Sequence, residues 1–255
     1  MSGRGPDVGR YDLLLVDIDG VVWLDGEPIR GAVEALNELS SMIEIRFVTN
    51  NSTRHRRVIA SLLRDAGLGW VGEEHVITSA STLADIAPSI GVRRCYVVGE
   101  EGLRGELRER GVDISDEGDV CVGMDRSFNY RKLTRALRNI LRGRLFLATN
   151  EDRTLPTSDG PIPGAGSMVS AISGACGRRP DLVVGKPNPL MFLLASRSVG
   201  ASHPLVIGDR PETDILGALR AGIDSALVLT GVVKEYEGVV PRPKYVLRSL
   251  MDLIR

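Results

Sequence analysis

The chain has 255 residues and a formal net charge of −1, and charged residues of both signs make up 25% of it. This balance argues against the basic surface that binds nucleic acid polymers or an anionic membrane. No apolar run approaches the length that spans a bilayer, and residues 1–10 lack the apolar segment of a signal peptide, so we expect a cytoplasmic protein. The length suits one large α/β unit or a core with an inserted second domain.

The first predicted strand ends in two aspartates. Residues 13–16 are apolar, and Asp17-Ile-Asp19-Gly follows directly. Alternate strand residues project to the same side, so we expect Asp17 and Asp19 to face one small volume at the carboxyl end of the strand, where open parallel α/β sheets bind ligands. Two carboxylates this close repel each other unless a cation or a shared proton relieves them, and Mg²⁺ suits them best. Asp-x-Asp-Gly also occurs in ordinary turns after strands.

The next elements predict a parallel crossover. Apolar residues at helical spacing over 31–40 and a β-branched run over 43–48 complete a strand–helix–strand unit, whose connection should be right-handed. Thr49-Asn50-Asn51-Ser52 then ends the second strand and opens a helix predicted over 53–66. These hydroxyls, amides and helix N–H groups could form an anion-binding cradle, and simple capping of the helix by Ser52 or Thr53 is an equally good interpretation.

From about residue 81 to 182 the pattern restarts as an α/β unit of its own. Strands predicted over 94–98, 119–122 and 145–149 alternate with helices predicted over 103–110 and 130–142. Glycines over 99–105 lack the spacing of a dinucleotide-binding loop, so we interpret them as a structural turn. The segment 149–166 is rich in Pro, Gly, Asp and Thr and too long for a plain connection, which is typical of functional or disordered loops. The predicted domains are a core over 1–80 and 183–255 and an inserted domain over 81–182.

The first pattern resumes after residue 182. A predicted strand over 182–184 precedes Lys186, another over 205–207 precedes Asp209 and Asp214, and a last strand covers 225–229. Because the carboxyl ends of parallel strands share one edge of a sheet, we expect six polar side chains to meet there. They are Asp17, Asp19, Thr49, Lys186, Asp209 and Asp214.

This set supplies the parts that cleavage of a phosphate ester needs. Asp17 is predicted to attack phosphorus. Asp19 is predicted to protonate the leaving oxygen and later to accept a proton from the attacking water. Mg²⁺ is expected on Asp17, on the backbone carbonyl of Asp19 and on Asp209.

The remaining polar residues are predicted to stabilise charge around the phosphoryl group. Lys186, the Thr49 hydroxyl and Asn50, together with nearby backbone N–H groups, would bind its oxygens. Asp214 would hold either a water on the metal or the ammonium of Lys186.

The order of these motifs resembles the haloacid dehalogenase superfamily of aspartate-nucleophile phosphatases. The motifs are Asp17-Ile-Asp19-Gly, Thr49-Asn-Asn-Ser, Gly185-Lys186-Pro-Asn-Pro and Gly208-Asp209-x-x-x-Thr213-Asp214. Trp23 and the segments 123–128 and 163–167 look like the class IIA subgroup, the 4-nitrophenylphosphatase-like enzymes. The resemblance extends from about residue 11 to residue 231.

The resemblance implies an α/β fold: a Rossmann-like, haloacid dehalogenase-like parallel-sheet core with an inserted α/β cap of the C2 type. It implies Mg²⁺-dependent hydrolysis of small phosphate monoesters through an aspartyl-phosphate on Asp17. The substrates of the subgroup include glycerol phosphate, phosphoglycolate, pyridoxal phosphate and nucleotide monophosphates, and the resemblance implies one of this kind for this chain. Cap residues near 150–156 should help choose the leaving group, although this chain has Asn150-Glu151-Asp152 where many members have Asn-Pro-Asp. The implied partner is a small phosphorylated metabolite, and several members also form a homodimer through the cap.

Two other interpretations fit parts of the pattern. A dehalogenase of the same superfamily needs no second carboxylate, because a halide leaves without a proton. A phospho-receiver or phospho-ligand binding module without turnover also carries Asp, Thr and Lys at strand ends, but it would be much shorter and would have no use for an inserted cap.

Overall fold

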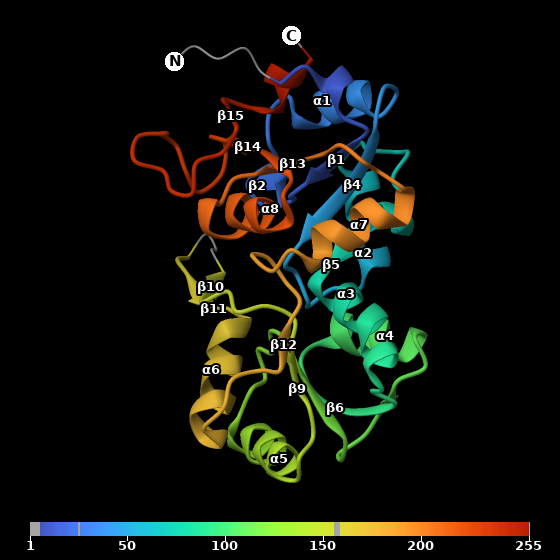
Figure 1. The fold of residues 1–255 in the computed structure, drawn as a ribbon, viewed down its shortest axis with the longest axis vertical. Coiled ribbons are helices and arrows are strands. Elements are labelled where there is room, and N and C mark those ends of the chain that lie inside the picture. Colours follow the sequence, from blue (N-terminus) through green and yellow to red (C-terminus); the bar gives the residue numbers. More distant parts are fainter. Residues whose placement is uncertain (1–5, 25, 156–158, 255) are drawn as a thin grey trace. The chain divides into compact units, whose positions relative to one another are not determined.

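The computed structural model describes residues 6–24, 26–155 and 159–254, which divide into two compact units (Figure 1). The core unit comprises the residues up to 49 together with 59–77 and 186 onwards. The inserted unit comprises 50–58 and 78–185. No helix in the described ranges is both long enough and apolar enough to cross a membrane.

The core unit is built on a six-stranded sheet in which the first strand of the chain lies between two others. The strand order is β15-β14-β13-β1-β4-β5. β1 pairs in parallel with β4 and β13, so that Leu14 lies opposite both Ile45 and Leu205. All four residues of β1 are buried, as expected for an apolar run that is covered on both faces. The strands are β1 (Leu13–Val16), β4 (Glu44–Thr49), β5 (Val76–Thr78), β13 (Pro204–Gly208), β14 (Asp224–Val228) and β15 (Tyr245–Leu247).

Helices cover both faces of this sheet. Leu14 and Val16 of β1 join one hydrophobic cluster with residues of α1 and α2, whereas Leu13 and Leu15 join a second cluster with residues of α7 and α8. This alternation places apolar side chains on both sides of each central strand and confirms the predicted Rossmann-like core. The helices are α1 (Ala32–Leu39), α2 (Arg56–Asp65), α7 (Leu190–Val199) and α8 (Leu216–Ala221).

Short elements connect these strands and helices. A hairpin of β2 (Trp23–Leu24) and β3 (Glu27–Pro28) follows β1, and a π-helical turn (Pro211–Ile215) precedes α8. Short 3-10 helices lie at Val8–Arg10, Glu73–His75 and Leu250–Leu253.

The second core helix begins later than the sequence predicts. α2 begins at Arg56, not at residue 53. The carboxamide oxygen of Asn51 accepts the backbone N–H groups of Thr53, at 2.9 Å, and Arg54, at 3.1 Å, and these bonds hold the chain in a turn before the helix. The Ser52 hydroxyl accepts the N–H of Met124 at 3.1 Å.

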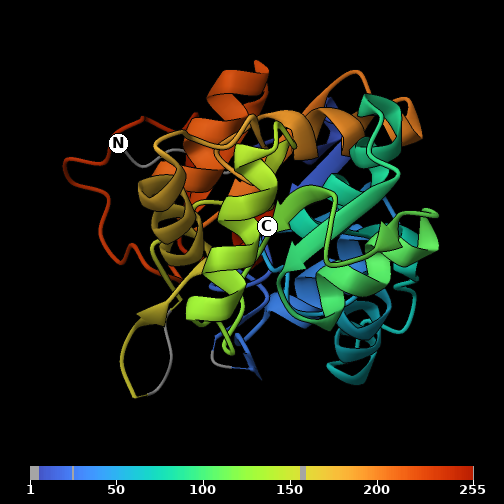
Figure 2. The same cartoon turned by 90° about the horizontal axis from the view of Figure 1, so that it is seen from below.

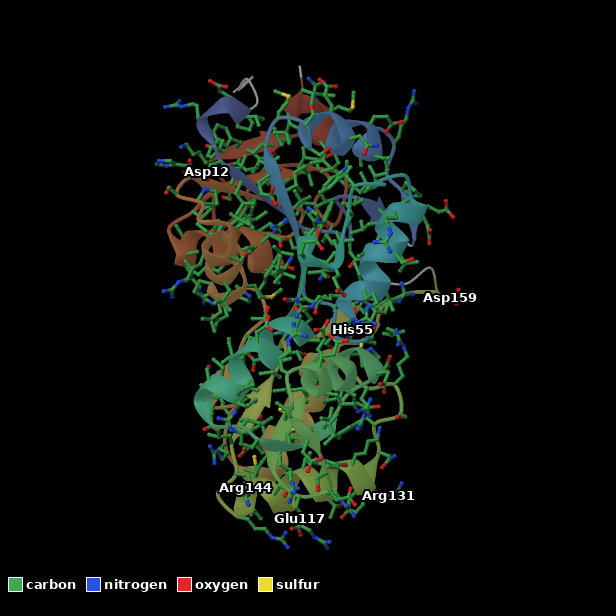
Figure 3. All side chains as sticks on the ribbon, turned by 90° about the vertical axis from the view of Figure 1, so that its right-hand side faces the viewer. Asp12, His55, Glu117, Arg131, Arg144 and Asp159 are labelled. Carbon is green, nitrogen blue, oxygen red and sulfur yellow. The ribbon has the colours of Figure 1, made fainter. Side chains whose placement is uncertain are left out.

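The inserted unit has its own five-stranded sheet, in the order β12-β9-β8-β6-β7. Its helices α5 and α6 lie side by side (Figure 2), and their buried residues form one core with β8 and β9. The outward face of α5 and the turns beside it are charged, and Glu117, Arg131 and Arg144 point away from the unit (Figure 3). The strands are β6 (Arg94–Val98), β7 (Asp113–Ile114), β8 (Asp119–Val122), β9 (Phe146–Ala148) and β12 (Leu182–Val183). The helices are α3 (Ser79–Ile86), α4 (Glu101–Glu109), α5 (Tyr130–Leu141) and α6 (Ala165–Cys176), with a 3-10 helix at Ala87–Ile90.

The long segment 149–166 contains a small hairpin. β10 (Thr154–Leu155) pairs antiparallel with β11 (Ile162–Pro163), so these parts of the expected loop are ordered by backbone pairing. Residues 156–158, which the predicted loop includes, lie outside the described residues.

The strand at 182–184 belongs to a different sheet from the one predicted. β12 pairs in parallel with β9, with Leu182 opposite Leu147 and Val183 opposite Ala148. The sequence pattern assigned this strand to the resumed core, because an apolar run before a motif looks the same in either sheet. Lys186 therefore enters the core unit from a loop and not from a core strand.

Replacing Asp125 with asparagine should destabilise the inserted unit. Lys132 Nζ lies 2.5 Å from Asp125 Oδ2, and the Ser127 hydroxyl donates to Oδ1 at 2.7 Å. Burial alone would raise the pKa of Asp125, but the hydrogen bonds from Lys132 and Ser127 and the charge of Lys132 bring it below its usual value. We expect the variant to lose about 2 kcal/mol of unfolding free energy at neutral pH.

The pH dependence of that loss distinguishes the ion pair from simple packing. Because the pKa is lower in the folded than in the unfolded state, the stabilisation is present at neutral pH and is lost as the pH falls below about 4. Urea unfolding of both proteins should therefore converge in acid. Asp113→Asn is the matched control in the same unit, because the exposed pair of Asp113 with Arg94 contributes little.

Candidate active site

Three carboxylates meet at the carboxyl ends of the central core strands. Asp17 follows β1, and its N–H donates to the carbonyl of Ile207 at 2.8 Å, which continues the sheet pairing by one residue. Asp209 follows β13, and Asp214 lies in the π-helical turn that begins two residues later. Ligand atoms of Asp17, Asp209 and Asp214 all lie within 4.8 Å of one another. The structure thus brings together three of the aspartates that the sequence placed at this edge.

Lys186 lies between two of these carboxylates. Its Nζ donates to Asp17 Oδ1 at 2.7 Å, to Asp214 Oδ1 at 2.6 Å and to the carbonyl of Val48 at 3.0 Å. The lysine is 3% exposed, so its charge is compensated by protein groups and not by water. Asp214 therefore contacts Lys186, as one of its two predicted roles requires.

Asp209 is held in a cradle that only glycine permits. A Cβ on Gly20 would lie 2.3 Å from Asp209 Oδ2, and a Cβ on Gly231 would lie 1.9 Å from it. Gly20 also has φ +85°, a conformation that other residues adopt at a cost. Oδ2 of Asp209 accepts the N–H of Val232 at 2.7 Å, while Oδ1 is buried and has no hydrogen-bond partner among the described residues.

Burial and the neighbouring charges shift the pKa values of Asp17, Asp209 and Lys186. Burial raises the pKa of Asp17 well above its usual value; Lys186 opposes the shift, and the charges of Asp214 and Asp209 add to it. Burial, reinforced by Asp214, raises the pKa of Asp209 to about 6. Burial alone would lower the pKa of Lys186, but Asp17 and Asp214 outweigh it and raise that pKa. Three carboxylates thus face one ammonium, an excess of negative charge that a divalent cation would relieve.

Asp19 lies in a different setting from Asp17. β1 ends at Val16, so the strand alternation that predicted a common direction for the two aspartates does not extend to Asp19. Asp17 is buried, whereas Asp19 is exposed and its Oδ1 accepts the indole N–H of Trp23 at 2.9 Å. Gly20, directly after Asp19, turns the chain toward the β2–β3 hairpin.

The two predicted phosphate-binding residues at the end of β4, Thr49 and Asn50, fall in different units. Thr49 is the last residue of β4 in the core unit and is 2% exposed. Asn50 belongs to the inserted unit, where its carboxamide donates to both carboxylate oxygens of Asp152, at 3.1 and 3.0 Å. Asp152 lies in the segment 150–156 that was expected to select the leaving group, of which Pro156 is outside the described residues.

A second cluster of metal-ligating side chains was not predicted from the sequence. His55 Nε2 lies 3.1 Å from Glu109 Oε2 and 3.6 Å from Glu106 Oε1 in the inserted unit; His55 is labelled in Figure 3. Glu106 also pairs with Arg56 and Arg110, each at 3.0 Å. Because these arginines already balance the charge of Glu106, we interpret the cluster as an ion-pair network that joins residues 50–58 to α4.

Known proteins match this chain along almost its whole length. The profile of the haloacid dehalogenase-like hydrolases matches residues 14–113, and a HAD-hydrolase-like profile matches residues 183–253. Dihydroxyacetone phosphatase of Corynebacterium glutamicum (strain R) is 36% identical, over 94% of this chain and 89% of its own.

Solved structures of phosphatases are similar to this chain over nearly its whole length. The p-nitrophenyl phosphatase from Archaeoglobus fulgidus has a TM-score of 0.89 and 36% identity, covering 98% of this chain and 99% of that one. A glycerol phosphate phosphatase from Mycobacterium tuberculosis in complex with magnesium has a TM-score of 0.87 and 35% identity, covering 97% and 78%. By sequence, fold and motif order, the chain belongs to the haloacid dehalogenase-like hydrolase family, in its class IIA branch.

Proposed function

We propose that this protein is a Mg²⁺-dependent phosphatase that hydrolyses small phosphate monoesters through an aspartyl-phosphate on Asp17. One observation carries the proposal: a buried ammonium, Lys186, bonds both Asp17 and Asp214 beside a third carboxylate, Asp209, one oxygen of which has no hydrogen-bond partner among the residues that the structure describes. Such a site holds a nucleophile, a fixed positive charge and a place for a cation within a few ångströms.

Asp17 is the nucleophile in this proposal. One of its carboxylate oxygens forms a bond to phosphorus while the bond from phosphorus to the ester oxygen breaks, and the alcohol leaves. Lys186, already 2.7 Å from Asp17 Oδ1, keeps the carboxylate oriented and lies close enough to meet charge on the phosphoryl oxygens. Asp19 protonates the leaving oxygen and accepts a proton from the water that later cleaves the aspartyl-phosphate. Thr49 and Asn50, at the end of β4, are proposed to bind phosphoryl oxygens.

The donor set fits Mg²⁺. The cation would be held by Asp17, by the backbone carbonyl of Asp19 and by Asp209, whose buried Oδ1 has no other partner in the described part of the chain. When bound, Mg²⁺ would neutralise the phosphoryl oxygens and orient phosphorus for in-line attack. Asp214 lies beside this set and holds Lys186.

Replacing Gly231 with alanine should weaken Mg²⁺ binding by about 10- to 100-fold, because the new methyl group would displace Asp209 Oδ2. The rise in thermal midpoint with increasing Mg²⁺ measures this affinity without any substrate. Gly69→Ala is the control, since a Cβ there would meet nothing within 4 Å. Equal Mg²⁺ responses in Gly231→Ala and wild type would mean that Asp209 is not a ligand.

The proposed substrates are phosphate esters of small alcohols. Two of the similar proteins are named for dihydroxyacetone phosphate and glycerol phosphate, so three-carbon esters come first in a substrate panel. Phosphoglycolate, pyridoxal phosphate and nucleotide monophosphates complete it.

The test is release of inorganic phosphate from this panel and from 4-nitrophenyl phosphate, with Mg²⁺ and with a chelator. Metal-dependent release from at least one ester supports the proposal, and the ranking of kcat/KM identifies the substrate class. A folded protein that forms a stable phospho-Asp17 and releases no phosphate would instead be a binding module.

Two further features are proposed from the sequence and the family resemblance alone. We infer a cytoplasmic location, and a homodimer formed through the inserted unit is the assembly that light scattering of the purified protein would test.

A further inference from the structure

The residue assigned to acid–base chemistry lies on an exposed turn. Asp17 is 8% exposed and held by Lys186, whereas Asp19 belongs to the exposed residues of the core unit. A solvated carboxylate on a turn can occupy several rotamers, and proton transfer requires one of them. Some other contact must therefore orient Asp19.

The indole of Trp23 provides that contact. Its Nε1–H donates to Asp19 Oδ1 at 2.9 Å, and within the part of the chain that the structure describes this is the one hydrogen bond to the Asp19 carboxylate. The rest of the Trp23 ring is half-buried against the hydrophobic core that contains Val21 and Val22. The donor is thus fixed from the core side while the acceptor faces outward.

The backbone of the same turn sets the spacing of donor and acceptor. Gly20 N–H donates to the Trp23 carbonyl at 2.7 Å, and the Ile18 carbonyl accepts the N–H of Val22 at 2.8 Å. Asp19 and Trp23 also form an isolated β-bridge. A carboxylate and an indole four residues apart are therefore held face to face by a closed turn, and not by chance proximity on a loose loop.

We propose that Trp23 is a positioning residue for Asp19: its N–H occupies Oδ1 and leaves Oδ2 to exchange the proton with the substrate. This inference rests on the proposed phosphatase function. In the first step the proton on Oδ2 moves to the ester oxygen, which receives the electron pair of the breaking bond to phosphorus. In the second step water attacks phosphorus, one of its protons returns to Oδ2, and the bond between phosphorus and Asp17 breaks.

Leaving-group dependence tests this role. Trp23→Phe keeps an aromatic ring in the core but removes the N–H donor. The informative quantity is kcat/KM, because it covers the steps up to release of the alcohol and excludes hydrolysis of the aspartyl-phosphate. For an alkyl ester such as glycerol phosphate, whose leaving oxygen needs a proton, we expect kcat/KM to fall about 10- to 100-fold. For 4-nitrophenyl phosphate, whose leaving group needs none, we expect a fall of no more than about threefold.

Trp70→Phe is the matched control. Trp70 also lies in the core unit, and its indole N–H donates to Asn37 Oδ1 at 3.0 Å. Trp70→Phe therefore deletes the same N–H donor at a site where its acceptor is an amide and not a carboxylate. In Trp70→Phe, the ratio of kcat/KM for glycerol phosphate to kcat/KM for 4-nitrophenyl phosphate should stay at its wild-type value. If kcat/KM of Trp23→Phe falls equally on both esters, or does not fall at all, the ratio stays at its wild-type value and the proposal is overturned. An equal fall would show a merely structural role for Trp23. Absence of phosphate release by the wild type would overturn the proposed function instead.

A second measurement does not depend on the folding of a Trp23 variant. The chain has two tryptophans, so a ¹⁵N-labelled sample gives two indole N–H resonances, and Trp70→Phe assigns them. In Asp19→Ala the Trp23 indole proton should move upfield because its acceptor is gone, while the Trp70 proton stays in place. A Trp23 resonance that does not move would show that the bond is absent in solution and would overturn the proposal.

Discussion

Asp17→Asn is expected to lower phosphate release by about 10⁴-fold or more, because it removes the attacking group itself. An amide cannot form the bond to phosphorus that a carboxylate oxygen forms. Asparagine keeps the shape of the side chain, and its amide oxygen can still accept the hydrogen bond that Lys186 now gives to Asp17 Oδ1. The variant should therefore fold. Acid-quenched samples should yield a phosphorylated peptide containing Asp17 from the wild type only.

Asp12→Asn is the control for this experiment. Asp12, which is labelled in Figure 3, lies just before β1, and its carboxylate accepts the N–H groups of Ser202, at 2.7 Å, and His203, at 2.9 Å. The same chemical change is thus made at the opposite end of the same strand, and turnover should stay at the wild-type level. Retention of more than about 1% of wild-type turnover by Asp17→Asn would contradict its assignment as nucleophile.

Lys186→Met should lower both activity and stability. Methionine has a similar length, but it leaves Asp17 and Asp214 buried without the ammonium that now bonds both of them. Removing one partner from a buried ionic group costs about 3–5 kcal/mol of unfolding free energy. Loss of one fixed charge from the phosphoryl site should lower kcat by about 10²- to 10³-fold. Urea unfolding followed by tryptophan fluorescence reports on the core unit, because both Trp23 and Trp70 lie in it.

Lys244→Met tests whether the effect depends on burial. Lys244 Nζ lies 2.5 Å from Asp224 Oδ2 in the same unit, but both side chains are exposed to water. Its replacement should leave turnover unchanged. A Lys186→Met protein as stable as the wild type would mean that Asp17 and Asp214 do not need the ammonium, which would contradict the electrostatic account of the site.

The core of the site could be predicted because its parts follow apolar strands. Asp17 and Asp209 directly follow β1 and β13, whose unbroken apolar runs mark buried parallel strands. Once two such strands are neighbours, their carboxyl ends coincide, and the residues after them meet. Lys186 was also predicted correctly as a neighbour of Asp17, although the strand at 182–184 on which that prediction relied belongs to the inserted sheet.

The sheet to which β12 belongs and the partners of Asn50 and Arg56 could not be predicted, because they depend on long-range pairings that local sequence does not encode. β12 joins the inserted sheet because β9 lies beside it, and its two apolar residues carry no mark of either sheet. Asn50 bonds Asp152 across 102 residues, and Arg56 bonds Glu106 across 50. The bond from Trp23 to Asp19 spans only four residues, so a closed turn between an aspartate and a tryptophan is a signal that sequence reasoning could have used.

The position of β1 inside the core sheet also governs the order in which the enzyme can be assembled on the ribosome. β1 is made before the inserted unit, whereas its neighbour β13 and the carboxylates of Asp209 and Asp214 are made after it. The sheet of the inserted unit, by contrast, draws all its strands from one continuous stretch, 78–185. The nascent inserted unit can therefore fold while the edge of β1 that pairs with β13 is still unpaired. The three carboxylates can meet only after residues 204–214 have been translated, so a product terminated before them carries Asp17 without Asp209 and Asp214.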